Sequence, residues 1–337
     1  MAGGPGAPRP RVVVTFPAGA ELREAISAAL AGEAEVVYLS DLDHAERAVA
    51  LESARALLSL SLERELEGPE EFGAIAAVGL VQLESAGADQ VPFERLPPGV
   101  PVASNAGAYA RPMAEHVLAM TLALAKRLPQ NQAALARGEF DQRTPSLEIR
   151  GSVVGILGYG GIGRASAALF AALGARIHAV GRGGHAIEGV DWAGTLEDLD
   201  ALLAVADAIV ITLPLTRSTR GLIGRRELEL MKPEAILVNP ARGAIVDEDA
   251  LYEHLRGHPS FSAGIDAWWQ EPRRHGSFAT RRPFFELPNL LGSPHNSAIT
   301  RGSLAAAAAT AAENVRDFLR GEAPRHLVDR REYAAQA

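Results

Sequence analysis

Apolar and polar positions alternate along the chain in a pattern typical of parallel α/β proteins. In the first hundred residues, short aliphatic runs predict strands, and the stretches between them predict helices. The predicted strands are 12–16, 36–39, 56–60, 77–83 and 100–104, and a helix is expected at 21–30. Strands that alternate with helices favour a parallel sheet whose faces are covered by those helices.

A second series of strands and helices begins near residue 152, after a helical pattern over 106–126. Its expected strands are 152–157, 177–180, 208–213, 235–238, 263–267 and 290–292. Six strands joined by crossovers predict a doubly wound sheet. An alanine-rich helix over 303–319 follows the last strand and is expected to pack back on the first domain.

Composition limits the classes of partner. A chain of 337 residues with 47% hydrophobic content is expected to form two domains. Its 33 basic and 41 acidic side chains give a net charge of −8, which argues against a nucleic-acid or acidic-membrane surface and favours a small-molecule partner. With no cysteine, disulfides, thiolate metal sites and a cysteine nucleophile are excluded.

Targeting segments are not expected. The opening residues 1–6 lack the apolar core of an export signal. The most apolar helical stretch, 113–125, carries Glu115 and His116 and is shorter than the ~18 residues that suggest a membrane span. We therefore expect a soluble, cytoplasmic protein.

The strongest chemical signal is a glycine-rich turn between the strand at 152–157 and a helix-forming segment. The turn consists of Gly158, Tyr159, Gly160, Gly161, Ile162 and Gly163. Glycines allow a tight turn and let backbone N–H groups approach a pyrophosphate at the N-terminus of the helix. In this setting the pattern predicts a dinucleotide-binding site, with a ligand-free glycine-rich connection as the alternative.

The end of the following strand bears on the choice of cofactor. In dinucleotide-binding folds an acidic residue at this position binds the adenosine ribose. Here Gly181 and Arg182 follow the strand at 177–180. A carboxylate would repel a 2′-phosphate, whereas a guanidinium pairs with one, so the sequence favours NADP(H), with NAD(H) as the alternative. The alternative is that Arg182 is an exposed loop residue with no effect on cofactor selectivity.

Motifs along nearly the whole chain resemble those of the D-isomer-specific 2-hydroxyacid dehydrogenases, a family that includes glyoxylate, hydroxypyruvate and phosphoglycerate dehydrogenases. The resemblance is carried, in order, by residues 85–89, 113–116, 158–163, 213–216, 239–243, 271–272 and 294–295. It implies a Rossmann-type sheet inserted into a flavodoxin-like substrate domain. The substrate domain would comprise 1–105 and 296–337, the dinucleotide-binding domain 106–295, with hinges near Asn105 and Asn296. Gly181 and Pro240 depart from the family pattern.

The resemblance also implies three catalytic roles at the ends of successive strands. Arg242 would bind the carboxylate and carbonyl of the substrate, His295 would transfer the proton, and Glu271 would orient His295. Delivery of a hydride to a 2-oxo acid builds negative charge on the carbonyl oxygen, which a cation stabilises and an imidazolium neutralises. A neighbouring carboxylate favours the imidazolium. Taken alone, Arg242 could be an exposed loop residue, Glu271 a solvated turn carboxylate and His295 a packed polar residue. The combination of the three favours catalysis.

Further contacts follow from the resemblance. The backbone of Ala86 and Gly87 would bind the substrate carboxylate, and Asp266 would lie near the nicotinamide carboxamide. The remaining expected cofactor contacts are Leu213, Pro214, Thr219 and Ala241. No metal is expected, because histidines and carboxylates lack the spacing of a zinc site.

The sequence thus favours an oxidoreductase that moves a hydride between NADP(H) or NAD(H) and a small 2-hydroxy or 2-oxo acid, with glyoxylate and hydroxypyruvate as the leading substrates. One alternative is a formate or phosphite dehydrogenase of the same fold, although formate dehydrogenases of this architecture have glutamine where Glu271 stands. Another is a dinucleotide-sensing binding protein similar to the C-terminal binding protein corepressors. A homodimer is expected from the resemblance and from the apolar residues of 106–126, which exceed the needs of one helix face.

Overall fold

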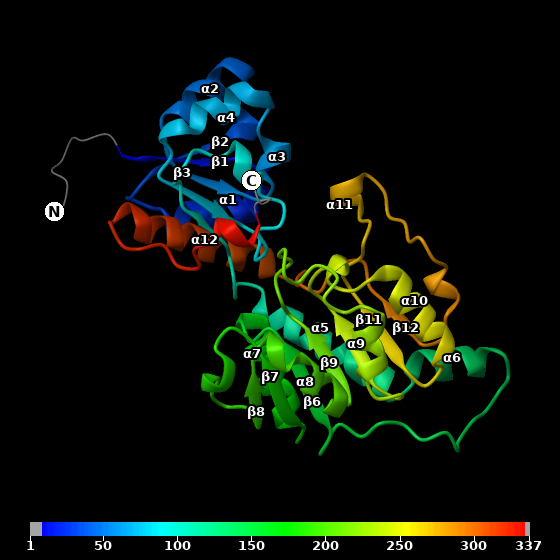
Figure 1. The fold of residues 1–337 in the computed structure, drawn as a ribbon. Helices are drawn as coiled ribbons and strands as arrows, with labels where there is room; N and C mark the ends of the chain where they lie inside the picture. The colour runs from blue at the N-terminus through cyan, green and yellow to red at the C-terminus, as the bar shows by residue number, and fades with distance from the viewer. Residues whose placement is uncertain (1–8, 334–337) are drawn as a thin grey trace. The chain divides into compact units, whose positions relative to one another are not determined.

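The computed structural model describes residues 9–333 and divides into two compact units (Figure 1). The first comprises Met1–Ala108 and Arg301–Ala337, and the second Tyr109–Thr300. The division thus falls at 108 rather than 105 and at 300 rather than 295. No helix in the described part is long and apolar enough to cross a membrane. The opening residues, on which the expectation about an export signal rests, lie outside the described range.

The first unit is built on a five-stranded sheet. Its strands are β1 (Arg11–Val14), β2 (Glu35–Tyr38), β3 (Ala54–Ser59), β4 (Leu80–Leu83) and β5 (Val102–Ala103). All are parallel and follow the order β2-β1-β3-β4-β5, the order of flavodoxin-like sheets. The strand expected at 77–83 begins only at Leu80, because 75–77 form a 3₁₀ turn.

Helices cover both faces of this sheet (Figure 1). On one face lie α1 (Ala20–Ala29) and α12 (Ser303–Leu319), and on the other α2 (His44–Glu52) and α4 (Gly68–Ala74), with the short α3 (Leu62–Glu65) after β3. In α12 the alanines at 307, 308, 311 and 312 are buried, which is the spacing of one helix face. The predicted helix over 303–319 and its packing on the first unit are confirmed.

The second unit is built on seven parallel strands in the order β12-β11-β10-β9-β6-β7-β8. They are β6 (Val153–Leu157), β7 (Arg176–Val180), β8 (Trp192–Gly194), β9 (Ala208–Ile211), β10 (Ile236–Asn239), β11 (Ser262–Ile265) and β12 (Leu290–Gly292). The predicted doubly wound sheet is confirmed, but the expected count of six strands was wrong. The missed strand, β8, pairs with β7 at the sheet edge and has three residues, which are too few to form a recognisable apolar run.

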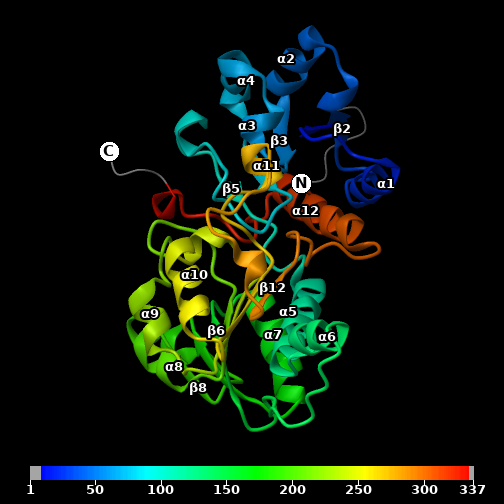
Figure 2. The same cartoon turned by 90° about the vertical axis from the view of Figure 1, so that its right-hand side faces the viewer.

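Figure 2 shows α8, α9 and α10 on one side of this sheet and α5 and α7 on the other. The helices are α5 (Ala110–Ala125), α6 (Leu128–Ala136), α7 (Gly161–Ala172), α8 (Leu199–Val205), α9 (Arg225–Leu230), α10 (Glu248–Gly257) and the short α11 (Pro272–His275). Since both faces are covered, strands such as β6 and β9 are buried at every residue.

The apolar residues of α5 have partners within the second unit. Val117, Met120 and Leu124 are buried in the core that α5 shares with α7 and the sheet. The excess of apolar residues in 106–126 is therefore explained by internal packing. The helix argument for a homodimer was wrong, and the dimer expected from the resemblance stays a prediction. Instead α6, which has no buried residue, carries exposed Leu128 and Leu135. After it the chain makes a wide excursion before returning to β6 (Figure 1).

Candidate active site

The glycine-rich turn connects β6 to α7, as the sequence predicts. Gly158 has φ +101°, a backbone conformation that side chains rarely adopt. A Cβ on Gly163 would lie 2.1 Å from the carbonyl oxygen of Gly158, so only glycine lets the helix approach the turn this closely. The two glycines therefore fix the path of the backbone between strand and helix.

The N-terminus of α7 fits an anionic group. Gly160 is the N-cap and provides no side chain that accepts a hydrogen bond from the first turn, so the leading N–H groups are left for a ligand. A Cβ added to Gly160 would meet nothing within 4 Å, which leaves open space beside the turn. Unsatisfied donors, the helix dipole and free space together fit the pyrophosphate of a dinucleotide.

Tyr159 and Gly181 lie next to each other beside this turn. A Cβ on Gly181 would be 3.4 Å from the backbone nitrogen of Tyr159, an ordinary contact distance. Arg182 follows, with an exposed side chain. The end of β7 therefore presents an arginine and no carboxylate near the glycine-rich turn.

The segment after β9 is held by its own threonines. Thr219 is buried, its hydroxyl donates to the carbonyl of Pro214 at 2.7 Å, and it accepts from the N–H of Thr216 at 2.8 Å. The Thr219 side chain thus shapes the loop that begins at Leu213. A cofactor contact from its hydroxyl stays a prediction.

The segment after β10 positions Arg242. Buried Asn239 donates from Nδ2 to the carbonyl of Arg242 at 2.9 Å and accepts at Oδ1 from the N–H of Ala241 at 3.1 Å. A Cβ on Gly243 would lie 2.4 Å from the carbonyl carbon of Trp268, so this glycine allows β10 and β11 to end side by side. The backbone on each side of Arg242 is therefore fixed.

His295 and Glu271 form a direct pair. The Nδ1 atom of His295 is 2.8 Å from each carboxylate oxygen of Glu271, and Glu271 Oε1 also accepts from the N–H of Trp268 at 2.7 Å. The side chains are 34% and 21% exposed, so a ligand can reach the imidazole while the carboxylate lies deeper.

Charges around Glu271 favour its ionised form. Burial by itself raises the pKa of this carboxyl group, but the hydrogen bond and charge of His295, the N–H of Trp268 and the charge of Arg242 outweigh burial and lower the pKa below its usual range. Arg242 follows β10, the strand paired with β11, which precedes Glu271. The structure brings the three predicted catalytic residues together at the carboxyl edge of the second unit's sheet.

Asp266 is fully buried at the end of β11. Its Oδ1 accepts from the hydroxyl of Ser293 at 2.5 Å and from the N–H of Asn296 at 3.1 Å, and Oδ2 accepts from the N–H of Ser297 at 3.2 Å. Burial opposes ionisation, but donors from Ser293 and Ser297 and the charge of His295 keep the pKa of Asp266 below its usual value. Asp266 thus anchors the segment that carries His295, and its contact with a nicotinamide stays a prediction.

Ala86 and Gly87 belong to the first unit, in the loop after β4. The hydroxyl of Ser85 donates to the carbonyl of Gly87 at 2.7 Å, which tightens the loop, and both residues are partly exposed. Their backbone N–H groups lie at the carboxyl edge of a parallel sheet, where ligands of such sheets bind. Their contact with the same substrate as Arg242 stays a prediction.

Two side chains near the His295–Glu271 pair received no role from the sequence. Ser293 bonds to Asp266, and His116 of α5 has its Nε2 2.9 Å from the Ser293 hydroxyl. The contact of Ser293 with Asp266 could have been predicted from strand pairing. Ile265 of β11 lies opposite Gly292 of β12, so the residues that follow them, Asp266 and Ser293, must be neighbours. Nothing in the sequence places His116 there. Trp268 and Trp269 mainly pack in the core of the unit.

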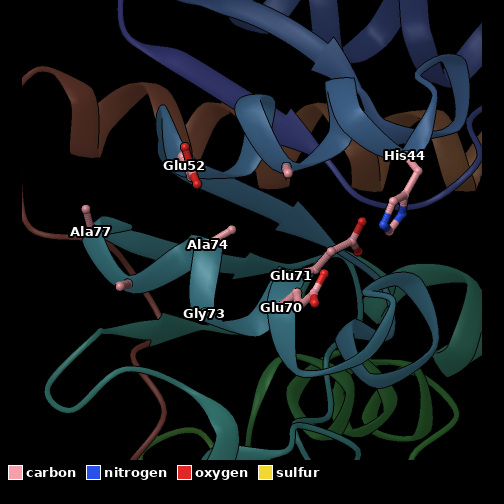
Figure 3. A pocket seen from close by; sticks show the side chains of 9 residues that line it. His44, Glu52, Glu70, Glu71, Gly73, Ala74 and Ala77 are labelled. Carbon is pink, nitrogen blue, oxygen red and sulfur yellow. The ribbon is translucent and has the colours of Figure 1, made fainter.

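One cluster outside this site has the residue types of a metal centre. In residues 9–333, the ligand atoms of His44, Glu67 and Glu71 lie within 4.8 Å of one another. Of these, His44 and Glu71 border a cavity of about 550 Å³ between α2 and α4, where Figure 3 shows Glu71 beside His44. Arg47, however, donates to both oxygens of Glu71 at 2.7 and 2.8 Å and already balances that charge. The cluster is thus an ion-pair network of the first unit.

Comparison with known proteins agrees with this fold and site. The family described as "D-isomer specific 2-hydroxyacid dehydrogenase, NAD binding domain" matches residues 118–297. Two relatives are a D-3-phosphoglycerate dehydrogenase from Methanocaldococcus jannaschii, 34% identical over 68% of this chain, and a glyoxylate reductase from Thermococcus onnurineus, 31% identical over 88%. The chain covers 43% of the length of the first relative and 90% of the second.

A solved structure shows the same fold over nearly the whole chain. It is a D-isomer specific 2-hydroxyacid dehydrogenase from Xanthobacter autotrophicus Py2 in complex with NADPH and MES, 28% identical, with a TM-score of 0.79 and coverage of 97% of this chain and 100% of that one. Residues 118–297 form a NAD-binding domain of Rossmann type. The chain belongs to the D-isomer specific 2-hydroxyacid dehydrogenase family.

Proposed function

We propose that this protein reduces short, unphosphorylated 2-oxo acids to the corresponding 2-hydroxy acids, with glyoxylate and hydroxypyruvate as the leading substrates. The observation that carries the proposal is the His295–Glu271 pair, with the charge of Arg242 acting on it, at the carboxyl edge of a dinucleotide-type sheet. A proton donor, its orienting carboxylate and a cation are the groups that reduction of a carbonyl requires.

Each residue has a defined task in this proposal. Arg242 binds the substrate carboxylate and stabilises negative charge that develops on the carbonyl oxygen. His295, held by Glu271, donates a proton to that oxygen. The N–H groups of Ala86 and Gly87 complete the binding of the carboxylate. The first unit is accordingly the substrate domain and the second the dinucleotide-binding domain.

The cofactor, when bound, supplies the hydride. The residues proposed to hold it are Gly158, Tyr159, Gly160, Gly161, Ile162, Gly163, Arg182, Leu213, Pro214, Thr219, Ala241 and Asp266. We propose a preference for NADPH over NADH. Arg182 at the end of β7 is suited to a 2′-phosphate, and Gly181 provides no carboxylate for the ribose hydroxyls.

Charges in the first unit support an unphosphorylated substrate. Glu65 accepts hydrogen bonds from the hydroxyls of Thr15 at 2.6 Å and Ser59 at 2.7 Å, so a carboxylate already occupies the ends of β1 and β3. The segments that follow β1, β3 and β4 (residues 15–19, 60–62 and 84–88) contain no lysine or arginine. A phosphate beside the Ala86–Gly87 loop would find no cation in these segments.

We further propose that the protein is a homodimer. Leu128 and Leu135 of α6 are 56% and 53% exposed, and Phe140 in the excursion that follows is 76% exposed. Apolar side chains gathered on one projecting segment are typical of a surface that a second copy covers.

Initial rates on a panel of acids test the proposal. Glyoxylate, hydroxypyruvate, pyruvate and a phosphorylated 2-oxo acid are reduced with NADPH or NADH, and formate oxidation is assayed with NADP⁺ and NAD⁺. We expect the highest kcat/KM with glyoxylate or hydroxypyruvate. Preference for the phosphorylated acid or for formate would overturn the substrate assignment. Tight cofactor binding without turnover of any acid would favour a dinucleotide-sensing protein.

A further inference from the structure

His116 on α5 contacts the hydrogen-bonded network beneath the catalytic histidine. Its Nε2 lies 2.9 Å from Ser293 Oγ and 3.8 Å from Asp266 Oδ1, and the side chain is 26% exposed. All three residues belong to the second unit. The contact therefore joins α5 to the ends of β11 and β12.

The ionised state of Asp266 fixes the direction of these hydrogen bonds. A carboxylate only accepts, so the Ser293 hydroxyl, 2.5 Å from Asp266 Oδ1, must donate its proton there. Ser293 Oγ then accepts from His116, so Nε2 of His116 carries the proton. The chain of donors runs from His116 through Ser293 to Asp266.

Asp266 in turn holds the segment that carries His295 by hydrogen bonds. Its carboxylate accepts from the N–H of Asn296, and its backbone carbonyl accepts from the N–H of His295 at 2.9 Å. His295 itself has φ +51°, an unfavourable conformation for a residue other than glycine that persists only where surrounding contacts enforce it. The contacts made by Asp266 provide that enforcement.

We propose that His116 is a positioning residue for His295, acting through Ser293 and Asp266. Without the donor from His116, the Ser293 hydroxyl is free to rotate away from Asp266, and the segment with His295 loses part of its restraint. The imidazole then departs more often from its contact with Glu271. This inference rests on the proposed function for its effect on turnover, but the coupling to His295 is measurable without turnover.

Three variants separate positioning from general stability. His116→Leu removes the donor, His116→Gln restores an N–H donor, and Glu115→Gln is a control at the exposed neighbouring position on α5. Loss of one hydrogen bond worth about 1.4 kcal/mol lowers a rate about tenfold. We expect kcat to fall about tenfold in His116→Leu and to recover in His116→Gln. The melting temperature and the Kd for NADPH should change little in both variants.

The signal of the His295 ring protons in ¹H NMR spectra provides the second readout. It is expected to shift or broaden in His116→Leu and to return in His116→Gln. His116→Leu combined with Ser293→Ala should be no slower than Ser293→Ala alone, because both changes break the same chain. Additive losses, or wild-type kcat and an unchanged His295 signal in His116→Leu, would overturn the inference. A wild type without turnover refutes the proposed function, while the NMR comparison still decides the coupling.

Discussion

The imidazole of His295 shares its Nδ1 hydrogen bond with both oxygens of Glu271, each 2.8 Å away, although the two residues lie 24 positions apart in the chain. Because Glu271 is held ionised, it accepts, and Nδ1 of His295 is the donor. Nε2 is then the nitrogen left for proton exchange with a substrate. The pair thus sets both the orientation and the tautomer of the imidazole.

Replacement of His295 with alanine is expected to lower kcat by ~10²–10⁴-fold, because general acid–base catalysis typically contributes that much. The Kd for NADPH should change little, since the glycine-rich turn lies on other strands of the sheet. Steady-state kinetics and fluorescence titration measure the two effects. Turnover equal to that of the wild type would remove His295 from the mechanism.

Arg242→Lys is expected to reduce kcat/KM strongly although the charge is kept. A guanidinium offers a planar fork that matches a carboxylate, which an ammonium does not reproduce. Asn239 fixes the backbone of residue 242 at the end of β10. The backbone therefore cannot move to bring the lysine ammonium into the position of the guanidinium. Rates on glyoxylate, with Arg226→Lys as an exposed control, test this. Kinetics like those of the wild type would contradict a bidentate contact.

Cofactor preference is expected to reverse in Gly181→Asp. A charge-assisted hydrogen bond is worth roughly 1.5–3 kcal/mol, so the wild type should favour NADPH over NADH by about ten- to a hundredfold. The backbone of Gly181 is not in the left-handed region, and an added Cβ meets only ordinary contacts, so the aspartate should fold. It would add a ribose acceptor and repel the 2′-phosphate.

The matched variant for cofactor preference is Arg182→Ala. It should weaken NADPH binding and leave NADH binding nearly unchanged. Dissociation constants for both cofactors across the three proteins provide the measurement. Full NADPH affinity in Arg182→Ala, or a wild type that prefers NADH, would show that Arg182 does not bind the phosphate.

Light scattering at micromolar protein is expected to report twice the chain mass of 35.5 kDa. Leu135→Asp together with Phe140→Asp should shift the protein toward the monomer, because both exposed apolar side chains would lie in the interface. Leu196→Asp, at an exposed apolar position far along the chain, is the control. A wild-type mass near 35.5 kDa would contradict the dimer, and a dimer unaffected by the double variant would place its interface elsewhere.

Acid should destabilise the fold through His254. Burial and then the charge of His258 lower the pKa of His254 to about 4 from 6.5, and its Nε2 has no hydrogen-bond partner in the part of the chain that the structure describes. Between pH 6.5 and about pH 4, His254 is protonated in the unfolded chain but not in the folded protein. The free energy of unfolding therefore falls as the pH falls through this range. We expect the free energy of unfolding to drop by about 1 kcal/mol from pH 7 to pH 5 on this account.

Denaturant titrations of His254→Leu and of His258→Gln, the exposed partner, test this assignment. The leucine variant should lose part of the acid sensitivity, since it has no proton to bind in either state. If its stability falls with pH as steeply as that of the wild type, other groups cause the effect.

The sequence by itself determined the layers of both sheets, the glycine-rich turn and the placement of Arg242, Glu271 and His295 at one edge of a sheet. Buried parallel strands require continuous apolar runs, and the turn between β6 and α7 requires glycine at 158 and 163, so these features are encoded locally. Arg242, Glu271 and His295 were predictable because each follows a strand of one parallel sheet, whose carboxyl ends must meet at one edge.

Only the tertiary structure decided how these residues are held. The edge strand β8 has no apolar run, and its pairing with β7 depends on the folded sheet. The contact of His116 with Ser293 joins residues 177 positions apart, on a helix and a strand end that meet only after the sheet is wound. The internal packing of α5 and the exposure of α6 were likewise beyond the sequence, because an apolar helix face does not reveal whether its partner is the same chain or another.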